Sequence, residues 1–156
     1  MKILFTSIVS LICLTGFSQT NLSTENAKTI IGVFFDGMNT GDTLKMKSIM
    51  MPNMGMQTAY LSKEGENKIT YSRGSDFIKM IGNLEKNTKI EERILDVRLE
   101  TDGNIANVWT PYEFYMNDTF SHCGANSFTL IYTDESWKIL NIIDSRRIGS
   151  CDQKKD

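Results

Sequence analysis

Apolar residues early in the chain repeat with the spacing of an α-helix. Over residues 22–41 they recur every three or four positions and form one broad stripe, which predicts an amphipathic helix. Ser23 is suited to cap its start and Gly41 to end it. Asp42 is suited to cap a second, short helix, which Pro52 would stop. The stripe comprises Ala27, Ile30, Ile31, Phe34, Phe35 and Met38.

Two strand-like runs follow, and then a third helix. Residues 57–62 and 68–72 are expected to form strands joined by a hairpin at Glu64–Gly65. Ser75 is then suited to cap a helix with one apolar side. That side carries Phe77, Ile81 and Leu84.

Beyond residue 90 the apolar period changes to two. Val97 and its apolar neighbours alternate with charged residues, which predicts a strand with one face in water. Asp102–Gly103 is a strong signal for a two-residue turn, which would pair Leu99 with Ala106. The even-numbered residues of the next strand then face the core: Ala106, Val108, Thr110, Tyr112 and Phe114.

Two more turns, at Asn117–Asp118 and Asp134–Glu135, complete a meander of four antiparallel strands. The order of the elements is two helices, a hairpin, a third helix and then this meander. It predicts an α+β fold in which the long first helix covers one face of a strongly twisted, mainly antiparallel sheet. No repeat or linker interrupts the chain, so we expect a single domain.

The face that carries His122 depends on the turn at Asn117–Asp118. A strict two-residue turn would pair Glu113 with His122, whereas a three-residue loop over 117–119 would pair Phe114 with His122. We adopt the three-residue loop, because it keeps the apolar residues that follow on the core face. The concave face then holds Tyr112, Phe114, His122 and Asn126, and Cys123 points to the back.

The last strand has two readings. We adopt the one in which Leu140 and Ile142 face the core, which adds Asp144 and Arg146 to the concave face. The opposite phase is supported by Trp137, Ile139 and Ile143.

The N-terminus has the pattern of a secretory signal. An apolar run over residues 3–14 follows Lys2, and small residues at 16 and 18 have the spacing that a signal peptidase reads. We therefore expect a cleavable signal peptide over residues 1–18, a single domain over 19–156, and a secreted or periplasmic protein. The rival is a lipoprotein signal modified at Cys13, which the preceding Ile12 disfavours.

Charge and cysteine content limit the partners. Without Lys2 the remaining chain has 16 basic and 19 acidic residues, a net charge of −3. No basic stripe is present, so we expect neither nucleic acid nor, after signal removal, a membrane as partner.

An exported pair of cysteines, Cys123 and Cys151, most simply forms a disulfide. The alternatives are a reactive free thiol or a pair of metal ligands.

Several segments resemble one known family. The end of the first helix, FFDGMNTGD, and the run YEFYMNDTFSHCGANSFTLIYTDESWKILNIIDSRR are similar to the nuclear transport factor two-like superfamily. Within it the chain most resembles exported bacterial members described as putative lumazine-binding. The resemblance implies a cystatin-like cone, a curved sheet around the long helix with a cavity at its open end. It leaves activity open, because this superfamily includes isomerases, dehydratases, cyclases, carriers and binding domains.

The concave face supplies the candidate ligand-binding residues. Aromatic surfaces beside directional hydrogen-bonding groups suit a small-molecule pocket, and a histidine can carry a proton near neutral pH. Alternatively, these polar groups satisfy one another within the wall. The sharper catalytic hypothesis pairs His122 with Asp144. The candidates are Tyr112, Phe114, His122, Asn126, Asp144 and Arg146.

Other unusual residues receive simpler interpretations. Four methionines over residues 50–56 could bind Cu(I), but we favour an apolar lip over the cavity and expect no metal or cofactor. Glu91–Glu92 is interpreted as a solvated strand start rather than a catalytic pair. Trp109 and Tyr115 fall on the outer sheet face, where exposed aromatics would suit a homodimer, a mode that the resemblance also implies.

Three functions follow from these observations. The first, which we favour, is an exported binding protein that holds an aromatic or heterocyclic molecule in the cone. The second is an enzyme of the isomerase, dehydratase or cyclase type that uses His122 with an acidic partner. The third is a non-catalytic dimeric interaction module whose cavity is filled by its own side chains. An open cavity distinguishes the first two from the third.

Overall fold

The computed structural model describes residues 21–85, 87–147 and 151. The predicted signal peptide, with Cys13, therefore lies outside the described residues. Within the described ranges, no helix combines the length and apolar character that a membrane crossing requires.

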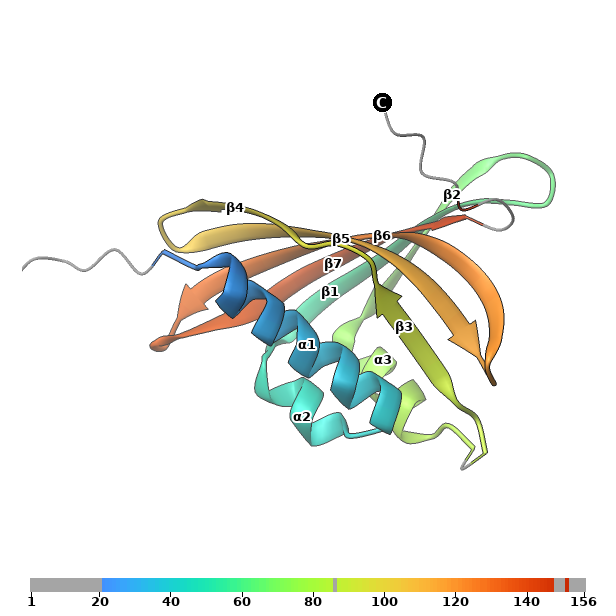
Figure 1. Ribbon diagram of the computed structural model, residues 1–156, viewed down its shortest axis with the longest axis horizontal. Coiled ribbons are helices and arrows are strands. Elements are labelled where there is room, and N and C mark those ends of the chain that lie inside the picture. Colours follow the sequence, from blue (N-terminus) through green and yellow to red (C-terminus); the bar gives the residue numbers. More distant parts are fainter. Residues whose placement is uncertain (1–20, 86, 148–150, 152–156) are drawn as a thin grey trace, which may run out of the picture.

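Three helices gather on one side of a curved seven-stranded sheet (Figure 1). The strand order is β2-β1-β7-β6-β5-β3, and β4 also pairs with β5. Among the strand pairs of the described residues, only β1 and β7 are parallel, and the others are antiparallel. The elements are α1 (Thr24–Thr40), α2 (Thr43–Ser48), β1 (Met50–Leu61), β2 (Asn67–Arg73), α3 (Gly74–Gly82), β3 (Ile90–Ile94), β4 (Arg98–Asp102), β5 (Ile105–Met116), β6 (Thr119–Thr133) and β7 (Ser136–Arg147). The predicted α+β fold is confirmed.

The predicted caps of the first two helices are confirmed, but Pro52 does not stop the second helix, because α2 ends at Ser48 and Pro52 lies within β1. The Ser23 hydroxyl accepts a hydrogen bond from the Asn26 amide at 3.1 Å, and Asp42 accepts one from the Lys45 amide at 2.9 Å. Gly41 ends α1 in the left-handed conformation, with φ of 73°. The inward face of α1 packs on the sheet, where Phe34 and Phe35 both meet Phe128 edge to face.

The predicted cap at Ser75 is wrong. Helix α3 begins at Gly74, directly after β2, and its N-cap Arg73 makes no side-chain cap hydrogen bond. Gly74 is packed against β1, because a Cβ there would lie 2.8 Å from Met50 Cε and 3.0 Å from Met54 Cε. This packing brings the chain into α3 one residue before Ser75.

The strand predicted before Asp102 is broken in two. Residues 95–97 separate β3 from β4, and both strands pair with β5. The turn lies at residues 103–104, so Leu99 pairs with Val108 and not with Ala106. The observed partner of Leu99 lies two residues beyond the predicted one. Because side chains alternate with a period of two, the same residues of β5 still face inward. Its even-numbered residues 106–112 are buried, as predicted.

The predicted three-residue loop in the next hairpin is wrong, yet its consequence is confirmed. Asn117 and Asp118 both have positive φ and form a two-residue turn between β5 and β6. A β-bulge follows, in which Ser121 is the extra residue, and it restores the predicted pairing of Phe114 with His122.

A second bulge resolves the two readings of the last strand. The register between β6 and β7 shifts at Leu140, which is 38% exposed, whereas Ile139 and Ile142 are both buried. The inward placement predicted for Leu140 is therefore wrong. The phase adopted for Asp144 and Arg146 is confirmed, because both lie beyond the bulge and face the cavity.

The predicted disulfide is present on the back of the sheet. Cys123 and Cys151 are bonded, with their Cα atoms 5.9 Å apart. Cys123 lies on β6 next to His122 and is buried. The bond therefore fixes the chain beyond β7 to the strand that carries the candidate site.

Candidate functional site

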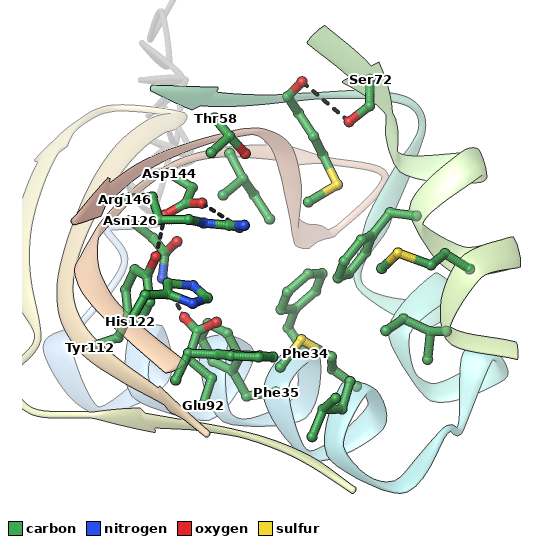
Figure 2. Close-up of a pocket in the computed structure, with 18 of the residues that line it drawn as sticks. Phe34, Phe35, Thr58, Ser72, Glu92, Tyr112, His122, Asn126, Asp144 and Arg146 are labelled. Atoms are coloured by element: carbon green, nitrogen blue, oxygen red, sulfur yellow. Dashed lines mark hydrogen bonds and ion pairs between the residues drawn. The ribbon is translucent and has the colours of Figure 1, made fainter. Parts of the chain in front are cut away.

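An open cavity of about 450 Å³ lies between the concave face of the sheet and helices α1 and α3. Every ligand-binding candidate proposed from the sequence lines it. Figure 2 shows the polar side chains gathered on the side formed by the strands, with Phe34 and Phe35 of α1 below them. The polar candidates are Tyr112, His122, Asn126, Asp144 and Arg146.

One polar group centres on Asp144. Its carboxylate accepts a hydrogen bond from the Tyr112 hydroxyl at 2.5 Å and pairs with the Arg146 guanidinium at 3.0 Å. Burial, followed by the Asp144 charge, raises the pKa of Tyr112 above its ordinary value, so the phenol remains a donor. Gly124 makes this arrangement possible, because a Cβ there would lie 2.8 Å from the Tyr112 hydroxyl and 1.8 Å from the Ser145 carbonyl oxygen.

A second polar group joins β3 to β6. The Asn126 amide donates to the Glu92 carboxyl at 2.7 Å and lies 3.4 Å from the Thr110 hydroxyl. Burial raises the pKa of Glu92 to about 8, although the Asn126 hydrogen bond opposes the shift. The nearby Asp144 charge adds to the rise. Glu92 is therefore mainly protonated at neutral pH.

His122 lies between aromatic rings. It stacks on Phe114 with centroids 4.8 Å apart and meets Tyr112 edge to face at 5.8 Å. Its Nδ1 lies 3.0 Å from the Ser121 hydroxyl. Burial, followed by the Arg146 charge, lowers the pKa of His122 to about 4, so the ring is neutral at physiological pH. Within the described chain, no carboxylate hydrogen-bonds to it, so the candidate pair of His122 and Asp144 is not joined directly, and its catalytic role stays a hypothesis.

The rest of the cavity is mainly apolar, with Gln57, Thr58, Ser72 and Ser121 as its other polar residues. Phe34 of α1 and Phe77 of α3 stack with centroids 6.1 Å apart and interplanar angle 12°. Methionines contribute to the lining, but of the cluster proposed as a lip over residues 50–56 only one member is among them. Met56 lines the cavity, whereas Met54 is buried in the core. The methionines of the lining are Met38, Met56, Met80 and Met116.

Sequence comparison identifies the family. Residues 23–143 match the family described as "Putative lumazine-binding". The chain belongs to this family. The chain has the nuclear transport factor two-like fold that the resemblance implied. A search of curated proteins found no match.

Solved structures similar to this family member share its fold at low sequence identity. A protein of unknown function from Silicibacter pomeroyi is 18% identical, with TM-score 0.58 over 81% of this chain and 100% of that one. A putative dehydratase from Streptomyces avermitilis is 15% identical, with TM-score 0.59 over 81% and 96%. The benzoate 1,2-dioxygenase beta subunit from Burkholderia mallei is 12% identical, with TM-score 0.63 over 81% and 92%.

Glu92 is an ionisable cavity-lining residue that the sequence interpretation missed. We assigned Glu91–Glu92 to a solvated strand start, and for Glu92 this is wrong, because it lines the cavity. The sequence contained a signal for this placement. In a strand, Glu92 shares one face with Ile90 and Ile94, and two apolar residues on that face indicate that it points inward. Glu91 faces outward, where its carboxylate pairs with Arg93 at 2.9 Å.

The outer sheet face of this lumazine-binding family member carries the two predicted aromatics. Trp109 is 40% exposed. The Tyr115 hydroxyl donates to Glu113 at 2.8 Å, and the Arg93 guanidinium lies 4.0 Å from the centre of its ring. These contacts hold Tyr115 against its own sheet, and a homodimer through this face stays a prediction.

Proposed function

We propose that this protein is an exported small-molecule-binding protein that holds an aromatic or heterocyclic ligand in the cone cavity. The observation that carries the proposal is an open cavity of about 450 Å³ with a polar wall on one side and a mainly apolar remainder. Binding pockets for small molecules have this size and this combination of lining groups. The name of the family, lumazine-binding, also supports a small heterocyclic ligand.

The arrangement of the polar groups favours binding over catalysis. An acid–base enzyme needs a proton-transfer group held by a suitable partner and directed at the substrate. Here Asp144 is occupied by Tyr112 and Arg146, and the nearest polar partner of His122 is the Ser121 hydroxyl. The open cavity argues against an interaction module filled by its own side chains.

Native mass spectrometry of the protein purified from its own source tests this proposal. We expect a retained small molecule on a chain that begins at residue 19 and carries an oxidised cysteine pair. Asn126→Leu should lose the molecule, because it removes an amide from the polar wall and places a larger apolar side chain there. Ser127→Leu, one residue away on the outer face, is the control and should keep it. An unchanged bound species in Asn126→Leu would contradict the pocket assignment.

A further inference from the structure

The charges that line the cavity cancel. Asp144 and Arg146 form an ion pair, with 3.0 Å between Oδ2 and the guanidinium nitrogen. The other ionisable side chains of the lining are Glu92, which burial keeps mainly protonated at neutral pH, together with the neutral His122 and Tyr112. A charged ligand would therefore lose its hydration without gaining an unpaired counter-charge.

The polar wall nevertheless keeps hydrogen-bonding capacity for a ligand. In the described part of the chain, Oε2 of Glu92 and Oδ1 of Asn126 have no protein hydrogen-bond partner. No buried side-chain oxygen or nitrogen of the described residues lacks a partner, so both atoms are accessible. The Asn126 amide nitrogen and Glu92 Oε1 are joined at 2.7 Å, which holds the two side chains together in the cavity lining. A neutral carboxyl supplies a donor, and the amide oxygen supplies an acceptor.

We infer that the cavity selects an uncharged ligand whose carbonyl oxygen adjoins an N–H group, as in an amide or lactam, and that Glu92 and Asn126 recognise this pair. The ligand carbonyl accepts from the Glu92 carboxyl, and the ligand N–H donates to Asn126 Oδ1. The inference rests on the proposed function, and adds to it the chemical class of the ligand and the residue that excludes charged competitors.

The walls beside this pair suit a flat ring system. The Phe114–His122 stack, with interplanar angle 26°, presents an aromatic surface next to the polar wall. Phe34 and Phe77 extend the apolar surface toward α3. An aromatic amide can therefore place its ring among these side chains while its amide reaches Glu92 and Asn126.

Three probes that share a naphthalene ring and differ in the charge of the head group test whether the cavity selects by charge. Calorimetric titration of the disulfide-bonded protein with 2-naphthamide, 2-naphthoate and 2-naphthylmethylammonium at about pH 6 should show the amide binding at least about tenfold tighter than either ion. Equal or tighter binding of a charged probe would overturn the inference. The neutral dye Nile red reports the cavity independently. If Nile red binds and 2-naphthamide does not, the inferred selection of an amide is wrong but the proposed binding function stands. If neither Nile red nor 2-naphthamide binds, the proposed binding function is wrong as well.

The Glu92 carboxyl gives a second readout. Raising the pH from about 6 to about 9 should weaken 2-naphthamide binding by about tenfold, because ionised Glu92 no longer donates. Glu92→Gln keeps a neutral donor at every pH and should abolish this dependence. Glu91→Gln, an outward-facing control on the same strand, should retain it. A flat profile in the unmodified protein, or an unchanged slope in Glu92→Gln, would overturn the role of Glu92.

Discussion

The Glu92 carboxyl makes the protonation of this cavity depend on pH near neutrality. Its pKa of about 8 in the folded protein exceeds the ordinary value of 4.5 because of burial. The folded state therefore binds this proton more tightly than the unfolded chain does. The contribution to stability is fully present below about pH 4.5 and is lost as the pH rises through 8.

We therefore predict that Glu92→Gln flattens the pH dependence of stability. Between about pH 5 and pH 8, urea unfolding of the unmodified protein should lose on the order of a few kcal/mol relative to this variant. His122, with its pKa lowered to about 4, acts in the opposite direction but titrates in both proteins. Parallel stability profiles for the two proteins would contradict a protonated Glu92 in the folded protein.

At the scale of the elements, the close approach of β6 and β7 depends on Gly124. A Cβ there would lie 1.8 Å from the Ser145 carbonyl oxygen and disturb Tyr112. We predict that Gly124→Ala lowers the free energy of unfolding by roughly 1–3 kcal/mol, the usual cost of overpacking, or more.

Gly32→Ala is the matched control. Apart from its chain neighbours and the backbone of its own helix, no atom lies within 4 Å of its added Cβ, and the residue is exposed in the middle of α1. Alanine should stabilise that helix by roughly 0.5–1 kcal/mol. Urea unfolding measures both changes, and equal stability of Gly124→Ala and the unmodified protein would refute the tight contact.

The two bulges explain how far the sequence could predict these elements. Alternation placed the inward face of β5 correctly, because that strand is regular through residues 105–114. It failed at Ser121 and Leu140, where one extra residue reverses the alternation. In β7 the conflict itself was a signal, since Ile139 and Ile142 can both face the core only if a residue between them is bulged.

At the scale of the whole molecule, the long-range parallel pairing was out of reach. Strand β1 pairs with β7, and the two strands are much farther apart in the sequence than the two strands of a hairpin. Local sequence patterns therefore do not indicate that β1 and β7 are partners. The pairing brings Thr58 opposite Asp144 at the cavity wall. The disulfide, by contrast, was predictable from the pair of cysteines left after the expected signal peptide.

The most direct measurement of the central claim is a crystal structure of the protein purified from its own source with its bound molecule retained. The account predicts electron density for an uncharged, flat molecule inside the cone, with its polar edge against Glu92 and Asn126 and its ring near Phe34. A cavity closed by its own side chains, or a ligand bound outside the cone, would contradict it.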